Sequence, residues 1–251
     1  MMDEPLIKPT PYDIEAKVES FHWWFVVRRK LLRLFLSSLD LPGGCVAIDI
    51  GCGVGSNLRI LGSAGLDVIG LDRSFYALSL ARKKIKFPLL NGDLNDLPLR
   101  PKSVGLIVAM DILEHLDNDV EGIHSFYQAL KEEGILILTV PAFRSLWGIQ
   151  DEVTFHKRRY SRYEIVNKLQ QEGFEIMKSS YFNFFLFFPI LFARWTIHFL
   201  NLKIESENKI NSSMLNLFLR AIFSMEVYVL KHFSFPFGVS IFCIARKSET
   251  I

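Results

Sequence analysis

The stretch that decides the fold is Ala47-Ile48-Asp49-Ile50-Gly51-Cys52-Gly53-Val54-Gly55. A short apolar strand runs into a glycine-rich turn, and a helix is expected to follow at 56–64. Glycines adopt backbone angles closed to other residues and allow a ligand to approach the main chain. A strand, a glycine turn and a helix start are typical of a nucleotide site. A dinucleotide fingerprint would place a third glycine where Ser56 stands, so the spacing disfavours that cofactor.

Outward from this stretch, strands and helices alternate, and several strands are continuously apolar. This pattern predicts an α/β fold with a mainly parallel sheet covered by helices on both faces. Helices are expected at 20–39, 74–84, 119–131 and 161–172, and strands at 46–50, 67–72, 87–90, 104–110, 134–140, 174–179 and 239–246.

Composition limits the class of protein. The 251 residues are 50% hydrophobic, which suits one globular domain, expected over 20–251. A net charge of +2 gives no argument for nucleic acid. Three cysteines without metal spacing indicate reduced cytosolic thiols, and no metal site is predicted. Residues 1–19 are acidic and carry prolines, which predicts a flexible arm without a signal peptide and a cytoplasmic protein.

The glycine run, with Asp49 inside the strand, reads D-x-G-x-G-x-G and resembles motif I of the class I S-adenosylmethionine-dependent methyltransferases. Further segments resemble later motifs of that family: Val68–Asp72, Asn91–Leu94, Asp111–Leu116 and Leu130–Leu136. The resemblance implies a Rossmann-like, seven-stranded sheet, S-adenosyl-L-methionine as cofactor and S-adenosyl-L-homocysteine as product. The residues it implies for cofactor binding are Asp49, Gly51, Cys52, Gly53, Gly55, Asn57, Asp72, Arg73, Asp93, Leu94 and Asp111.

Two more segments resemble a group of type 11 methyltransferase-like proteins: His22–Arg29, with the pattern H-x-W-F-x-x-R-R, and the H-K-R-R-Y run of 156–160. The first implies that Trp24 and Arg28 face the cofactor, the alternative being ordinary helix packing. In the second, three successive cations are suited to phosphate or carboxylate, or form a solvated basic turn. The candidate catalytic residues are His115, as a general base or a surface histidine, together with His156 and Tyr160.

A phenylalanine-rich insert is expected at about 181–235, between the last two strands. Its charge-free part, 181–193, is 13 residues long, whereas a membrane-spanning helix needs about 20. A helical pair is therefore predicted, with Arg194 and Lys203 beside its aromatics favouring a place near a membrane. It could line a pocket for a lipid or isoprenoid, rest on a membrane surface, form a dimer interface, or simply cap the sheet.

The sequence thus predicts a methyltransferase that acts on a small molecule, lipid-like or a glycoconjugate precursor, by in-line displacement. It is expected to be a monomer or homodimer, cytoplasmic or peripheral at a membrane. Two other classes stay open. One is a cofactor-binding regulatory protein without activity, and the other is an NAD-type oxidoreductase.

Overall fold

The sheet that carries the glycine run has seven strands in the order β3-β2-β1-β4-β5-β7-β6. The computed structural model describes residues 10–93, 96–200 and 212–248. Strands β1 to β5 pair in parallel, and β7 runs antiparallel to both of its neighbours, β5 and β6. The strands are β1 Val46–Ile50, β2 Asp67–Asp72, β3 Leu89–Asn91, β4 Val104–Met110, β5 Leu130–Pro141, β6 Phe174–Phe182 and β7 Ser240–Lys247.

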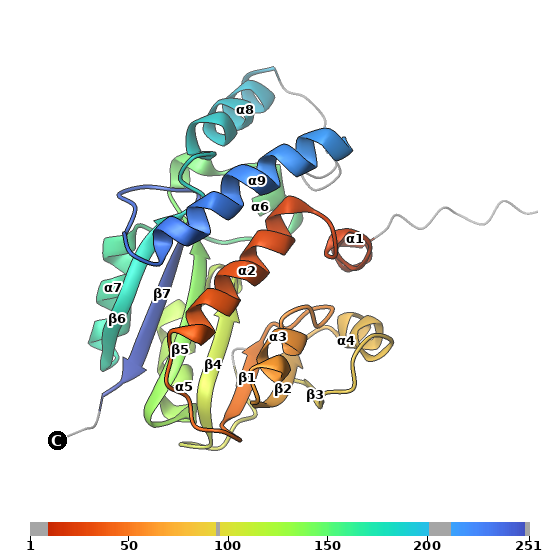
Figure 1. Cartoon of the computed structure of the whole chain (residues 1–251). Coiled ribbons are helices and arrows are strands. Elements are labelled where there is room, and N and C mark those ends of the chain that lie inside the picture. The colour runs from red at the N-terminus through yellow and green to blue at the C-terminus, as the bar shows by residue number, and fades with distance from the viewer. Residues whose placement is uncertain (1–9, 94–95, 201–211, 249–251) are drawn as a thin grey trace, which may run out of the picture.

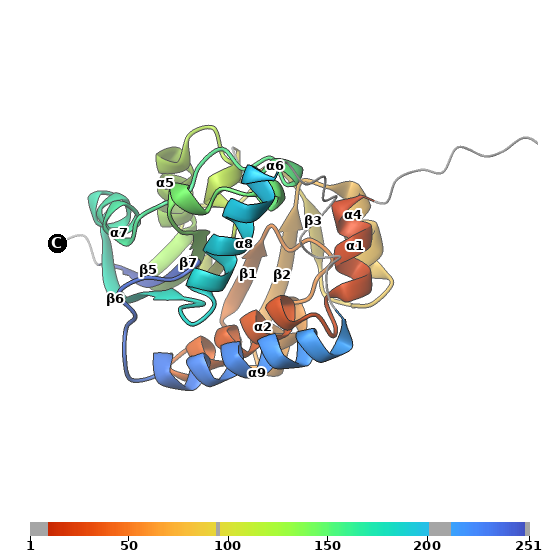
Figure 2. The same ribbon diagram turned by 90° about the horizontal axis from the view of Figure 1, so that it is seen from above.

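Helices cover both faces of the sheet, as the alternating pattern predicts. Figure 2 shows α2 and α9 on one face and α5 and α7 on the other. The helices are α1 Pro11–Val18, α2 Trp23–Ser37, α3 Leu58–Ser63, α4 Phe75–Arg82, α5 Asp119–Ala129, α6 Ile149–Val153, α7 Arg162–Gln171, α8 Phe187–Phe199 and α9 Ser213–Leu230, with short 3₁₀ turns η1 Leu113–His115 and η2 Arg144–Leu146.

Local sequence signals account for the helix starts. The Ser74 hydroxyl accepts the Ala77 amide hydrogen at 3.1 Å, and Ser161 does the same for Glu164 at 3.2 Å, so both are side-chain N-caps. Helix α3 begins only at Leu58, two residues later than expected, because the glycine turn extends further.

The arm expected over residues 1–19 needs correction, because residues 11–18 form helix α1. Thr10 and Asp13 make a reciprocal capping box, and Pro11 stands at the first helical position. The helix lies beside the carboxyl edge of the sheet, next to α4 (Figure 1). Lys84 binds the Glu19 carboxylate at 2.6 Å and so ties this segment to the end of α4. Residues 1–9 lie outside the described part of the chain.

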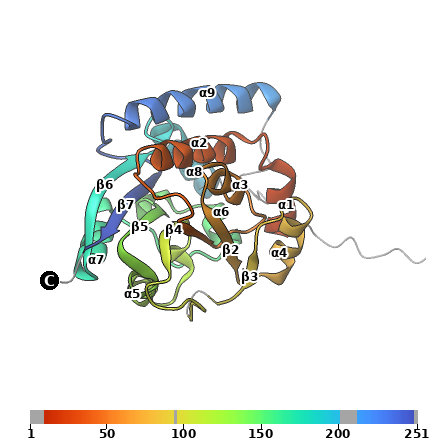
Figure 3. The same cartoon turned by 60° about the horizontal axis from the view of Figure 1, so that its bottom comes forward.

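The aromatic insert contains the expected helical pair between β6 and β7. Helix α9 lies along α2 as the outermost layer on that face (Figure 3). The Asn216 side chain fixes the contact: its Oδ1 accepts the Trp23 amide hydrogen at 2.7 Å, and its Nδ2 donates to the Phe21 carbonyl at 2.9 Å. The buried Glu226 carboxylate accepts the amide hydrogens of Asn183 and Phe184, which secures α9 to the end of β6.

Candidate cofactor and acceptor site

The glycine turn requires left-handed backbone at all three of its glycines. Gly51, Gly53 and Gly55 have φ values of 71°, 53° and 84°, a region that other residues enter at a cost. Gly51 is also tightly packed, since a Cβ there would stand 1.9 Å from Cδ1 of Ile112. The loop that follows β1 is therefore shaped by the segment that follows β4.

Asp72, at the end of β2, holds the glycine turn through two hydrogen bonds. Its Oδ2 accepts the Gly53 amide hydrogen and its Oδ1 the Ser74 amide hydrogen, both at 2.8 Å. The side chain is buried, and burial raises the pKa of Asp72 although the two bonds act to lower it. Asp72, which was predicted to bind the cofactor, therefore also holds the glycine loop in its conformation. Cys52, another predicted contact, is a buried thiol whose amide hydrogen bonds to the Leu71 carbonyl at 3.0 Å.

Two more carboxylates gather at the same turn. Asp49 is buried in β1, and its Oδ2 accepts no hydrogen bond, while its Oδ1 accepts the Asn57 side-chain amide at 3.4 Å. Glu15 of α1 lies over the loop, because a Cβ on Gly53 would meet the Glu15 carboxylate oxygens at 3.5 and 3.6 Å. Burial raises the pKa of each acid to about 7. The glycine turn is therefore surrounded by carboxylates, and one hydrogen-bond acceptor, Asp49 Oδ2, has no partner.

Arg28 of α2 and Asp111, which follows β4, meet at the carboxyl edge of the sheet. Arg28 forms an ion pair with Asp111 Oδ2 at 2.6 Å and donates to the Thr139 hydroxyl at 3.0 Å. Thr139 in turn donates to Asp111 Oδ1 at 3.0 Å. Asp111 has a φ of 61°, and the Arg28 Nε is buried without a hydrogen-bond partner. The site therefore offers one buried cationic donor among its acids.

Other predicted residues lie in different surroundings. The Trp24 ring stacks on Phe182 and Phe223, with centroids 6.2 and 5.8 Å apart, so it packs against the insert. Arg73 and Asp93 are exposed just after β2 and β3. Leu94 lies outside the described residues.

His115 and His156 come together although 40 positions separate them. Their ring centroids are 4.8 Å apart, and His156 Nε2 lies 3.8 Å from Oε1 of Glu114. Burial, followed by the nearness of His156, lowers the pKa of His115 to about 4, so its ring is neutral at pH 7. Glu114 is completely buried, and burial, with the nearby charge of Asp111, holds its pKa well above the usual range.

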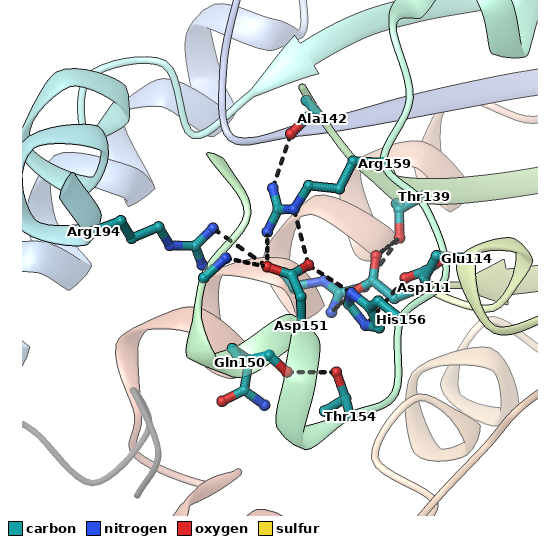
Figure 4. A network of polar contacts seen from close by, with 12 residues as sticks. Asp111, Glu114, Thr139, Ala142, Gln150, Asp151, Thr154, His156, Arg159 and Arg194 are labelled. Carbon is teal, nitrogen blue, oxygen red and sulfur yellow. Dashed lines mark hydrogen bonds and ion pairs between the residues drawn. The ribbon is translucent and has the colours of Figure 1, made fainter. Parts of the chain in front are cut away.

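Asp151 is the centre of the polar network in Figure 4. It accepts two hydrogen bonds from Arg159, both at 2.9 Å, and its Oδ1 pairs with His156 Nδ1 at 2.8 Å. Burial acts to raise the pKa of Asp151, but the bonds from His156 and Arg159 outweigh it and hold that pKa below the usual range. The carboxylate is thus charged, and it fixes the orientation of the His156 ring.

The basic run at 157–159 is largely engaged within the protein. Lys157 pairs with Asp117, and Arg158 with Asp119 at 3.1 Å. His156 and these cations nevertheless line a cavity of about 550 Å³, together with Arg144 and Trp147. The run therefore forms one wall of a cavity at the carboxyl edge, with most of its charge already compensated.

Tyr160 does not fit the catalytic role that was predicted for it. Its side chain is 1% exposed, and its hydroxyl donates to Asp119 Oδ2 at 2.9 Å. Burial, and then the charge of Asp119, raise the pKa of Tyr160 far above its ordinary value. A phenol held in this way packs the core and is not placed to exchange protons with a substrate.

Three acids of the site were not singled out from the sequence. Glu15 lay in the presumed arm, although the Thr10–Asp13 capping pair was a local sign of a helix there. Glu114 belongs to the Asp111–Leu116 segment that resembles the family, but the sequence assigned no role to it. Asp151 lies in a long polar loop, and its partners depend on how that loop folds, so the sequence assigned no role to it.

Comparison with known proteins agrees with this geometry. Residues 48–138 match the family model described as a methyltransferase domain. A probable S-adenosylmethionine-dependent methyltransferase of Mycolicibacterium smegmatis is 25% identical over 134 residues, which are 51% of this chain and 51% of that protein. The chain therefore spans about half the length of this curated relative.

Solved structures share the fold. A putative methyltransferase solved with the Haloferax volcanii Trm112 methyltransferase activator has a TM-score of 0.64 at 16% identity, covering 97% of this chain and 100% of that one. A Haemonchus contortus phosphoethanolamine N-methyltransferase in complex with S-adenosyl-L-methionine has a TM-score of 0.62 at 17% identity, covering 93% and 57%. The fold is therefore that of the class I methyltransferases. Residues 48–138 thus resemble a methyltransferase domain, and the whole described chain has the class I methyltransferase fold.

Proposed function

We propose that the protein transfers the methyl group of S-adenosylmethionine to a small, lipid-like acceptor that it takes from a membrane surface. The observation that carries the cofactor assignment is the acid-rich glycine turn. Asp49, Asp72 and Glu15 surround the largely buried glycine loop, with Arg28 as the neighbouring cation. S-adenosylmethionine has a sulfonium, an ammonium and one carboxylate, so its charges match this set. The pyrophosphate of NAD would be repelled by it.

The roles of the chain's own residues follow from their positions. Asp72 and the glycine amides orient the nucleoside portion, and Asp49 with Arg28 suits the amino-acid portion. The cofactor supplies an activated methyl group and a neutral leaving group. The protein has to align the acceptor with that methyl group and exclude water, which lowers the barrier chiefly through proximity. Helix α1, with Glu15 over the turn, closes one side of this site.

The lipid-like acceptor is proposed because α8 and α9 carry an exposed apolar surface. Helix α8 has no buried residue, and its Phe192, Trp195 and Phe199 are 73%, 66% and 89% exposed. On α9 large apolar side chains are exposed at helical spacing: Met214, Leu217, Phe218, Met225 and Tyr228. Monomeric soluble proteins rarely leave such a surface to water.

A membrane interface is the occupant that we infer for this apolar surface. Helix α9 is long and apolar enough to cross a bilayer by length and composition. Its other face, however, packs on α2 through Asn216, so it fits a position parallel to the interface. Aromatic side chains such as Trp195 are well suited to the headgroup region.

Calorimetry with S-adenosylmethionine and with NADH tests the cofactor assignment. We expect binding of the first alone, and the reverse result would refute the proposal. Methyl transfer is then measured with labelled cofactor and separate lipid and aqueous cell extracts. Label in a lipid product supports the acceptor class, whereas label only in a water-soluble product contradicts it. Cofactor binding without label in either extract would indicate a binding protein that is not an enzyme.

Vesicle flotation tests the membrane surface. With vesicles of phosphatidylcholine and phosphatidylglycerol, we expect the wild type to float and Trp195→Ala/Phe199→Ala to float severalfold less. Tyr163→Ala is the matched control, since Tyr163 is 77% exposed on α7, away from the apolar surface. Equal flotation of all three proteins, or a stable dimer that ignores vesicles, would overturn this part.

A further inference from the structure

Glu114 is a buried acid whose position the cofactor site does not explain. Its side chain is completely inaccessible, and neither carboxylate oxygen accepts a hydrogen bond. The two nearest arginines of the network are engaged elsewhere, Arg28 with Asp111 and Arg159 with Asp151. Burying a carboxylate without hydrogen bonds costs several kcal/mol unless it is protonated or paired with a cation. The protein therefore keeps an unpaired carboxylate at a position where an apolar side chain would make the folded state more stable.

Two imidazoles face this carboxylate. One ligand atom each from Glu114, His115 and His156 lie within 4.8 Å of one another. Ligands around an ion at about 2.1 Å stand roughly 3.4 Å apart in a tetrahedral site. A movement of about 1 Å by the two partly exposed rings would therefore close the set. The main chain keeps the two segments together, because the Lys157 amide hydrogen bonds to the Glu114 carbonyl at 2.8 Å.

The second histidine is already oriented as a metal ligand would be. Asp151 pairs with Nδ1 of His156 at 2.8 Å and leaves Nε2 directed at Glu114, 3.8 Å away. A carboxylate behind a histidine in this way fixes its tautomer and ring orientation and increases its basicity as a ligand. The bidentate Arg159 in turn holds Asp151.

We propose that Glu114, His115 and His156 bind a divalent transition-metal ion. Two imidazoles and one carboxylate suit Zn²⁺, Fe²⁺, Co²⁺ or Ni²⁺ rather than Mg²⁺ or Ca²⁺, which prefer oxygen ligands. Three protein ligands leave at least one coordination position open, as in catalytic rather than structural sites. The single charge of Glu114 offsets half of the charge of the ion, while Asp111 and Asp151 neutralise the adjacent arginines.

The open position would receive an oxygen of the acceptor. His156 also lines the basic cavity of about 550 Å³, so an acceptor in that cavity reaches the ion without passing through the core. This role rests on the proposed methyl transfer, whereas metal binding itself does not. The acceptor that follows is a lipid-like molecule that carries a hydroxyl group.

Titration of the metal-free protein with Co²⁺, followed by its visible absorption, tests the site directly. We expect one Co²⁺ per chain and about tenfold or greater loss of affinity in Glu114→Gln, His115→Ala and His156→Ala. Asp151→Asn should weaken binding about 10–100-fold, because it removes the carboxylate that orients His156. Zn²⁺ should displace Co²⁺ and abolish the absorption.

His124→Ala is the matched control, since His124 is an exposed histidine on α5 paired with Glu172. It should bind Co²⁺ like the wild type. S-adenosylmethionine binding is measured on the same proteins, so that loss of metal is distinguished from loss of the cofactor site or of the fold. A wild type without Co²⁺ absorption, or Glu114→Gln and His156→Ala with wild-type affinity, would mean that Glu114 is simply protonated, and would overturn the proposal.

Discussion

Replacing Gly51 by alanine should destabilise the protein by two separable effects. The first is backbone strain, because φ is 71° and left-handed backbone costs about 1–2 kcal/mol in a residue with a Cβ. The second is overpacking, because the new Cβ would stand 1.9 Å from Cδ1 and 2.9 Å from Cγ1 of Ile112. Inserting a methyl group into a filled site costs about 1–3 kcal/mol. The sum is roughly 2–5 kcal/mol.

Urea unfolding followed by circular dichroism measures these effects, and Gly65→Ala separates them. Gly65 has a φ of 78°, but its added Cβ would meet no atom within 4 Å, so it should lose only the backbone part. Ile112→Val removes the clashing Cδ1 atom at its own cost of about 0.5–1.5 kcal/mol. The double variant Gly51→Ala/Ile112→Val should then be more stable than the sum of the single effects. Additivity within about 0.5 kcal/mol, or equal losses in Gly51→Ala and Gly65→Ala, would refute the packing argument.

Three further outcomes are expected. Asp72→Ala should weaken binding of S-adenosylmethionine by about 1.5–3 kcal/mol in calorimetry. The Gly53 and Ser74 amides lose the carboxylate that accepts their hydrogen bonds, and the glycine loop loses its support. Unchanged affinity would reject this role for Asp72. Burial raises the pKa of Glu15 and of Asp49 to about 7 in the free protein. A cationic cofactor favours the ionised carboxylates, so the two acids should release protons when it binds. The affinity for the cofactor should therefore increase as pH rises from 6 to 8. Calorimetry in buffers of different ionisation enthalpy detects those protons, and their absence at pH 6 would count against the acid-rich site. Tyr160→Phe should lose about 1–2 kcal/mol of stability in urea, as its bond to Asp119 disappears, yet keep its methyl-transfer rate, and a large fall in rate would restore a catalytic role.

The sheet and the cofactor edge were predictable because their signals are local. Strand β1, the glycine turn and Asp72 occupy one contiguous stretch, and each strand is a short apolar run. The strand expected at 134–140 shows the limit of this reasoning. In the structure β5 begins at Leu130, and the turn before it becomes a bulge with Glu133 at a φ of 60°. The start of β5 is determined by its pairing with β4, and the local sequence gives no sign of that pairing.

Side chains whose roles depend on distant partners were harder to predict. Tyr160 lies in a motif-like basic run, but its neighbour Asp119 comes from the start of α5. The family resemblance implies that Trp24 faces the cofactor, yet its ring stacks on Phe182 and Phe223, which are more than 150 positions away. In both cases tertiary packing determines the role. A motif fixes where the main chain passes and leaves open which way a large side chain turns.

Arg194 shows how the insert is joined to the acceptor side of the site. In the sequence it stands beside exposed aromatics and suggests a cation at a membrane surface. In the structure it points inward, donates to the Leu146 carbonyl and lies 3.9 Å from Asp151 Oδ2 (Figure 4). The carboxylate that orients His156 is therefore held partly by helix α8, which also carries the exposed Phe192, Trp195 and Phe199. An insert that served only as a membrane anchor would need no such contact. The contact between Arg194 and Asp151 is what we expect if the insert both receives the methyl acceptor and helps to position the residues around which it reacts.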